Sequence, residues 1–155
     1  MSNRFSSRHL LVIGGTSGIG LAIAQRVIAE GGNATVVGSR QEKARQAEQA
    51  LAGRGKALGV NIASDVGLNE VVALVRDHAA PFDALVNAAG VFNPKPFTEH
   101  TTEDYDRYLE LTRSQFFITQ AFAKRLIAAN LPGSIVNIGS MWARQAIEAT
   151  PSSAY

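Results

Sequence analysis

The sequence contains no cysteine, so the chain cannot form disulfide bonds or thiolate metal sites. It also lacks any dense run of lysine and arginine, and its 15 basic and 13 acidic residues leave a formal net charge of only +2. No apolar run approaches the ~20 residues that a membrane-spanning helix needs. We therefore expect neither nucleic acid nor a membrane as a partner, and the absence of cysteine suits a reducing, cytoplasmic environment.

Histidine is scarce too, and the three that are present do not indicate a metal site. His9, His78 and His100 are far apart in sequence, and none has another ligand at a metal-binding spacing. Hydrophobic residues make up 46% of the 155 residues and charged residues 18%, which is typical of a single globular domain. The apolar run at residues 10–13 is too short for the core of a signal peptide and leads directly into glycine, so it predicts a buried strand.

Short apolar runs alternate along the chain with longer stretches of helical periodicity. The short runs predict strands at residues 9–13, 34–38, 56–60, 82–87 and 134–138. The longer stretches predict helices at residues 18–30, 41–52, 65–79 and 101–130, with Ser64 as an N-cap and with Thr101 and Asp104 as a capping box. Strands that are apolar throughout and alternate with helices indicate an α/β fold, a Rossmann-type doubly wound parallel sheet covered on both faces. In such a sheet a ligand crevice lies at the carboxyl ends of the strands.

Glycines are concentrated where the first predicted strand meets the first predicted helix. Glycine lets the backbone turn tightly and approach a diphosphate, while the start of the helix offers free N–H groups and a partial positive charge. Hydroxyl groups in the same loop can add hydrogen-bond donors. The cofactor-binding residues predicted in this segment are Gly14, Thr16, Ser17, Gly18, Ile19 and Gly20. The alternative is a tight strand–helix turn that binds no ligand.

The second predicted strand ends in Ser39 and Arg40 and carries no carboxylate there. A protein that prefers NAD usually holds the ribose 2′-hydroxyl with an acidic residue at this position, and the nearest acid, Glu42, lies inside the next predicted helix. Arg40 offers a planar cation suited to a 2′-phosphate, and Ser39 can add a hydrogen bond. The sequence therefore predicts NADP(H) as the cofactor, with NAD(H) as the alternative if Arg40 is only solvated.

The spacing Gly14-x3-Gly18-x-Gly20 resembles the glycine motif of the short-chain dehydrogenase/reductase family in its shorter subtype, with Ile13 where the family usually has threonine. Further segments follow in the family's order. Asn61-Ile62 resembles the Asp-Val pair that lines the family's adenine pocket. The stretch after the fourth predicted strand resembles its Asn-Asn-Ala-Gly motif and adds the predicted cofactor-binding residues Asn87, Ala88, Ala89 and Gly90. Two final segments resemble those that end in the catalytic serine and tyrosine, here Ser140 and Tyr155.

The resemblance implies hydride transfer between a nicotinamide ring and a carbonyl or alcohol carbon of a small-molecule substrate. Ser140 would hydrogen-bond the substrate oxygen, and Tyr155 would donate or accept the proton. The family places a lysine four residues after this tyrosine, whereas the sequence ends at Tyr155. Alignment with the family also puts Thr112 where many members have an asparagine that holds a water molecule.

The same resemblance predicts that residues 1–155 form one NADP-binding Rossmann domain that is incomplete, with five strands present and the family's last two missing. We therefore expect the isolated chain to be inactive and its last strand to expose an apolar edge. Full-length family members form homo-oligomers, in which the helix predicted at residues 101–130 is half of the usual interface.

Two other functions stay open at this point. The chain could be a dinucleotide-binding module without catalysis, or a truncated remnant without function. Titration with NADPH would separate the remnant from the other two, and turnover of carbonyl compounds would separate an enzyme from a binding module. A nucleotide-sugar epimerase of the family's extended subtype is disfavoured by the glycine spacing. The substrate is not readable, because residues 91–100 and 141–150 suit loop packing as well as a pocket.

Overall fold

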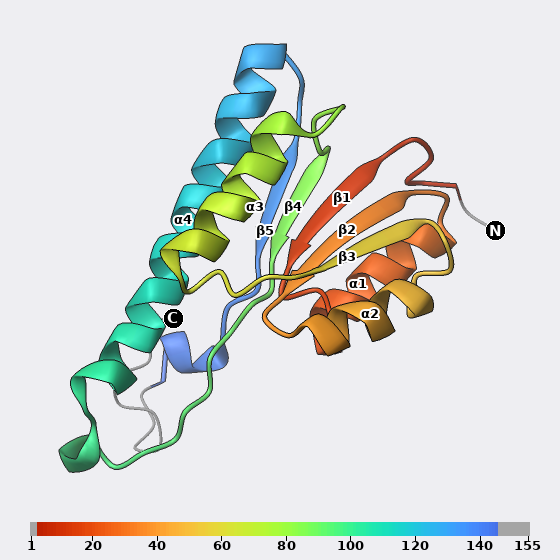
Figure 1. The fold of residues 1–155 in the computed structure, drawn as a ribbon. Coiled ribbons are helices and arrows are strands. Elements are labelled where there is room, and N and C mark those ends of the chain that lie inside the picture. Colours follow the sequence, from red (N-terminus) through yellow and green to blue (C-terminus); the bar gives the residue numbers. More distant parts are fainter. Residues whose placement is uncertain (1–2, 146–155) are drawn as a thin grey trace.

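The computed structural model describes residues 3–145, and its centre is a twisted five-stranded sheet (Figure 1). The strands stand in the order β3-β2-β1-β4-β5, and every pair of neighbours is parallel. Their bounds are β1 (His9–Ile13), β2 (Asn33–Gly38), β3 (Gly55–Gly59), β4 (Ala84–Asn87) and β5 (Ser134–Asn137). The arrangement confirms the predicted α/β fold with a doubly wound parallel sheet.

In the described part of the chain, four α-helices cover the sheet, two on each face (Figure 1). α1 (Gly18–Ala29) and α2 (Gln41–Ala50) lie on one face, and α3 (Asp65–Asp77) and α4 (Thr102–Ala129) lie on the other. All four were predicted, and their observed ends differ from the predicted ends by no more than two residues. Two short 3₁₀ helices, η1 (Phe97–Glu99) and η2 (Met141–Ala143), were not predicted, because one turn leaves no periodic pattern in a sequence.

The central strand β1 supplies apolar side chains to both faces of the sheet. Leu11 and Ile13 belong to the cluster formed with α3 and α4, while Leu10 and Val12 belong to the cluster formed with α1 and α2. All four side chains are buried. A strand packed on both faces needs apolar residues at consecutive positions, which explains the unbroken run in the sequence.

Side-chain caps fix where α3 and α4 begin. The Ser64 hydroxyl oxygen accepts a hydrogen bond of 3.1 Å from the Gly67 amide at the start of α3. Thr101 and Asp104 form a reciprocal capping box at the start of α4, and Asn130 ends that helix in the left-handed conformation, with φ of 51°. Both predicted caps are therefore confirmed.

Strand order reverses at β1, because β2 and β3 lie on one side of it and β4 and β5 on the other. In a doubly wound sheet such a switch point leaves a crevice at the carboxyl ends of the strands. At the far edge, Ile135, Val136 and Ile138 are 43%, 48% and 39% exposed, which agrees with the expected apolar edge. Within residues 3–145, no helix combines the length and the apolar character that crossing a membrane requires.

Candidate functional site

A cleft of about 920 Å³ opens at the switch point. Its walls come from the segments that follow β1, β2, β3 and β4 and from the first half of α4. Nearly all of the predicted cofactor-binding residues line it, namely Gly14, Thr16, Ser17, Gly18, Ile19, Gly20, Ser39, Arg40, Asn61, Ile62, Ala88, Ala89 and Gly90. Segments that are far apart in the sequence thus meet around one cavity, as the topology requires.

The floor of the cleft depends on two glycines at positions where a side chain would have no room. Gly14 has a φ of +82°, and a Cβ atom there would lie 2.4 Å from the Ala89 amide nitrogen. A Cβ atom on Gly20 would lie 2.3 Å from the Gly14 carbonyl oxygen. Since both obstacles are backbone atoms, neither can move aside cheaply. The loop after β1 therefore packs directly on the loop after β4 and on the first turn of α1.

Gly18 is required for its conformation, because its φ of +55° disfavours a side chain although nothing lies within 4 Å of a built Cβ atom. The adjacent N-cap residue of α1, Ser17, makes no side-chain capping hydrogen bond, and the first turn contains no acidic residue. The first N–H groups of a helix have no acceptor within that helix and carry a partial positive charge. Open backbone donors at the edge of the cleft fit a diphosphate group.

The loop after β3 is held in place by α4. The Ile62 carbonyl oxygen accepts a hydrogen bond of 2.5 Å from the hydroxyl of Ser114, which is only 1% exposed. The Asn61 side-chain oxygen accepts a hydrogen bond of 3.2 Å from the Ala63 amide. Sequence reasoning missed Ser114, although a serine on the buried stripe of a long helix signals that a polar partner faces it.

Asn87 is the one predicted cofactor-binding residue that does not line the cleft. It is buried, and its side-chain nitrogen donates hydrogen bonds of 3.0 Å to the Thr119 hydroxyl and 2.8 Å to the Asn137 side-chain oxygen. These contacts join β4 to α4 and to β5. Asn87 therefore holds the end of β4 in place, and the residues that follow it form the cleft wall.

The cleft wall after β4 has a second support, which the sequence did not reveal. The Gln115 side-chain nitrogen donates a hydrogen bond of 2.7 Å to the Ala89 carbonyl oxygen. One turn earlier on the same helix, the Thr112 hydroxyl donates to the Tyr108 carbonyl oxygen at 3.0 Å. The Thr112 hydroxyl proton is therefore committed to its own helix, which leaves the hydroxyl only as an acceptor toward a water molecule.

Two cations, Arg40 and Lys43, line the cleft beside the carboxyl end of β2. Arg40 was predicted from the sequence, whereas Lys43 was not. The acidic residues in the lining, Glu103, Asp106 and Glu110, all belong to α4. α4 also contributes one cation, Arg107, so its side of the cleft carries three acidic side chains and one basic side chain, while the β2 side carries only the two cations.

The two predicted catalytic residues are placed differently. Ser140 is the N-cap of η2, and its hydroxyl oxygen accepts a hydrogen bond of 3.2 Å from the Trp142 amide. Ser140 is not among the residues that line the cleft. The Trp142 ring lies 5.5 Å from the Phe92 ring, centroid to centroid, so η2 contacts the segment that follows β4. Tyr155 lies outside the described residues.

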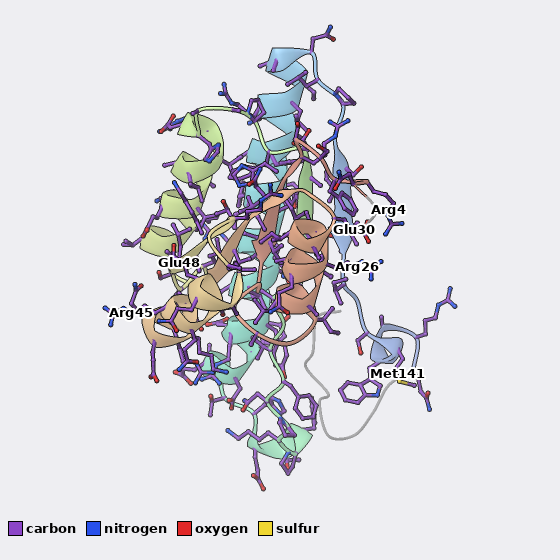
Figure 2. All side chains as sticks on the ribbon, turned by 90° about the vertical axis from the view of Figure 1, so that its right-hand side faces the viewer. Arg4, Arg26, Glu30, Arg45, Glu48 and Met141 are labelled. Carbon is purple, nitrogen blue, oxygen red and sulfur yellow. The ribbon has the colours of Figure 1, made fainter. Side chains whose placement is uncertain are left out.

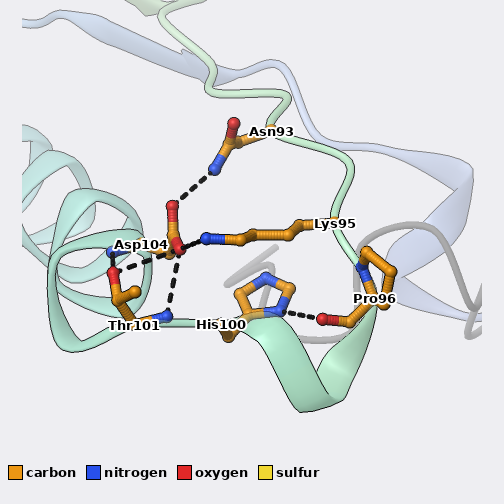
Figure 3. Close-up of polar contacts among 6 residues, drawn as sticks. All are labelled: Asn93, Lys95, Pro96, His100, Thr101 and Asp104. Carbon is orange, nitrogen blue, oxygen red and sulfur yellow. Dashed lines mark hydrogen bonds and ion pairs between the residues drawn. The ribbon is translucent and has the colours of Figure 1, made fainter.

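That segment is in turn pinned to the start of α4 by the Asp104 carboxylate (Figure 3). One carboxylate oxygen accepts a hydrogen bond of 2.9 Å from the Asn93 side-chain nitrogen. The other accepts hydrogen bonds of 2.5 Å from the Lys95 ammonium group and of 3.0 Å from the Thr101 amide. The hydrogen bond from Lys95 and that from the Thr101 backbone hold the pKa of Asp104 well below its usual range. The carboxylate that closes the capping box thus also positions the loop beyond the cleft wall.

Comparison with known proteins bears on this site. A family model described as short chain dehydrogenase matches residues 8–154. Curated relatives include a sorbitol dehydrogenase from Cereibacter sphaeroides, which is 29% identical over 143 residues, 92% of this chain and 56% of the relative. They also include an NADP-dependent (R)-specific alcohol dehydrogenase from Lentilactobacillus kefiri, which is 27% identical over 144 residues, 91% of this chain and 57% of the relative.

Solved structures show the same likeness. L-sorbose reductase from Gluconobacter frateurii, complexed with NADPH and L-sorbose, matches with a TM-score of 0.88 and 27% identity, covering 98% of this chain and 59% of that one. The chain spans little more than half the length of these relatives. The family match runs from the start of β1 through the glycine loop, the cleft and β5. The chain belongs to the short-chain dehydrogenase family.

Proposed function

We propose that the protein binds NADP(H) in the cleft and is an oxidoreductase that acts on a carbonyl or alcohol group of a small molecule. One observation carries the proposal: the glycine loop at the start of α1 and the Arg40 side chain line the same cleft. Arg40 follows β2, and no carboxylate stands at the end of that strand. The first feature fits a diphosphate, and the second fits a 2′-phosphate. The NADP-dependent relative and the NADPH-bound neighbour support the same cofactor.

Each wall of the cleft has a part in holding the cofactor. Amides at the start of α1 would donate to the diphosphate, and the Arg40 guanidinium and the Ser39 hydroxyl would donate to the 2′-phosphate. Asn61 and Ile62 would border the adenine. Ile19, which is 63% exposed at the cleft, offers an apolar surface to a ring of the cofactor. NADP(H), when bound, supplies or takes up the hydride.

The remaining chemistry is proton transfer and orientation of the substrate. The Ser140 hydroxyl would donate a hydrogen bond to the substrate oxygen, which fixes its direction and offsets the charge that develops on it. The Tyr155 hydroxyl would give a proton to that oxygen in reduction and take one from it in oxidation. Because a tyrosine has an ordinary pKa of ~10, a neighbouring cation is needed to favour its phenolate at neutral pH.

Dinucleotide binding without turnover is the second candidate. Two observations favour it: the Thr112 hydroxyl proton is committed to Tyr108, and Ser140 does not line the cleft. Measuring both binding and turnover on the same material separates the two candidates.

The experiment is a calorimetric titration of the protein with NADPH and with NADH, followed by assays of a panel of carbonyl compounds. We expect tighter binding of NADPH and a reversal of that preference in Arg40→Asp. Binding of NADPH without turnover of any compound would favour the second candidate. No binding of either dinucleotide by folded protein would refute both.

A further inference from the structure

Lys43 is the third residue of α2 and lies three residues after Arg40, which precedes the helix. Residues separated by three positions at the start of a helix lie on the same side of it. Both side chains line the cleft, as does Ser39. The end of β2 therefore presents two cations to the same cavity.

The surroundings of Lys43 are unusual for a lysine that is partly buried. Such an ammonium group is normally paired, as at Lys95, which lies 2.5 Å from the Asp104 carboxylate. In residues 3–145, neither Lys43 nor Arg40 forms an ion pair or a side-chain hydrogen bond. The neighbouring Glu42 interacts with Gln46 further along the helix, at 3.4 Å. Lys43 thus lines the cleft without an ion-pair partner among the described residues.

The start of α2 is also held firmly against the sheet. A Cβ atom on Gly59 would lie 2.5 Å from the Cα atom of Gln41, so the end of β3 and the first turn of α2 are in direct backbone contact. This contact fixes the backbone of the first turn of α2, from which Lys43 reaches the lining of the cleft. Because that backbone is already in place, only the side chain has to be ordered when a phosphate group binds.

We propose that Lys43 is a second specificity-determining residue for the 2′-phosphate of NADP(H), acting together with Arg40. The inference rests on the proposed function, because it assigns Lys43 to the same cofactor site. The ammonium group donates to a phosphate oxygen as a compact charge, while the planar guanidinium of Arg40 binds two oxygens at once. The two side chains divide the three terminal oxygens of the phosphate between them.

The test compares Lys43→Met and Lys43→Arg with the matched control Arg45→Met. Arg45 is exposed on α2 and does not line the cleft, so its replacement removes one positive charge from the same helix (Figure 2). Calorimetry with NADPH, NADH and 2′,5′-ADP gives three affinities for each protein. We expect Lys43→Met to weaken the binding of NADPH and of 2′,5′-ADP about five- to tenfold and to leave the affinity for NADH within about twofold of the wild type. Lys43→Arg should keep most of the affinity for NADPH, and Arg45→Met should match the wild type.

Other results overturn the inference in distinguishable ways. If Lys43→Met binds NADPH as the wild type does, while Arg40→Met does not, Lys43 has no role and the proposed function stands. Equal weakening of NADPH and NADH would make Lys43 a general contact and not a determinant of specificity. If the wild type itself binds NADPH no more tightly than NADH, the proposed cofactor preference fails and the role of Lys43 fails with it. Thermal melting of each variant identifies any loss of affinity that comes from unfolding.

Discussion

The Gln115 side chain donates a hydrogen bond of 2.7 Å to the Ala89 carbonyl oxygen, and so joins the middle of α4 to the wall of the cleft. The amide nitrogen of the same residue, Ala89, lies against the bare Cα atom of Gly14 on the other side. The segment at Ala89 is therefore contacted from two directions, by the side chain of Gln115 and by the backbone of Gly14. Each contact can be removed separately.

Gln115→Ala removes the first contact. We expect a loss of about 1 kcal/mol in the free energy of unfolding, because a partly buried carbonyl loses its donor. If the freed segment moves, NADPH affinity should fall by up to about fivefold. The control is Gln120→Ala on the same helix, where the side chain only accepts an exposed hydrogen bond from Lys124. Urea unfolding and calorimetry measure the two effects, and equal results for the two variants would contradict the role of Gln115.

Gly14→Ala places a Cβ atom where Gly14 now lies against Ala89, and Gly53→Ala is its matched control. Both glycines have a similar positive φ, +82° and +77°, but nothing lies within 4 Å of a Cβ atom at Gly53. Gly53→Ala should therefore cost about 1 kcal/mol of stability through backbone strain and leave binding unchanged. Gly14→Ala adds a collision with the backbone of Ala89, so it should cost more stability and weaken the binding of NADPH at least about tenfold. An affinity for NADPH equal to that of Gly53→Ala would show that the close approach is not needed for binding.

The fold could be predicted because each element carries a local signal. Apolar runs of strand length, helical periodicity and capping residues are all local, so the order of elements and the class of fold, a doubly wound parallel sheet, followed from the sequence. Ser64 and Thr101 were identified as caps for the same reason. Their partners lie only three residues away.

The supports of the cleft could not be predicted, because they join residues that are distant in sequence. Ser114 acts on Ile62 across 52 residues, and Gln115 acts on Ala89 across 26. Asn87 shows the same limit. Its motif suggested a residue that supports the sheet and lies close to the cofactor, but the partners of its side chain, Thr119 and Asn137, are 32 and 50 residues away in the sequence.

Lys43 was missed for a related reason. The start of its helix at Gln41 was predicted correctly, but the helix is rich in charged residues along its length. Which of these residues face the cleft depends on how α2 packs on the sheet, and that packing involves residues distant in sequence, such as Gly59.

Ser140→Ala tests the catalytic assignment of this serine. We expect kcat/KM for a carbonyl substrate to fall about 100-fold or more, because a donor to the developing charge is lost. The dissociation constant for NADPH should stay within about twofold of the wild type, because Ser140 does not line the cleft. Ser134→Ala, which removes a hydroxyl from the exposed start of β5, is the control. Unchanged turnover in Ser140→Ala would remove this residue from the mechanism.

Glu30 links stability to pH at the opposite end of α1 from the cleft. Its side chain is buried between Arg4 and Arg26 and accepts hydrogen bonds from both guanidinium groups (Figure 2). The hydrogen bond from Arg4 is the main cause that lowers the pKa of Glu30 from its ordinary 4.5 to about 2. The unfolded chain therefore binds this proton at a higher pH than the folded chain, and the stabilisation is complete above 4.5 and is lost as the pH falls through about 2.

Glu30→Gln should accordingly be less stable than the wild type at neutral pH and should lose less further stability between pH 4.5 and pH 2. Urea unfolding at a series of pH values across this window measures both effects. Glu48→Gln removes a carboxylate from the exposed face of α2 and is the matched control (Figure 2). It should leave the pH dependence close to that of the wild type, because no guanidinium holds this carboxylate within the described residues. Parallel stability curves for the wild type and Glu30→Gln through the window would show that the Arg4 contact does not form in solution.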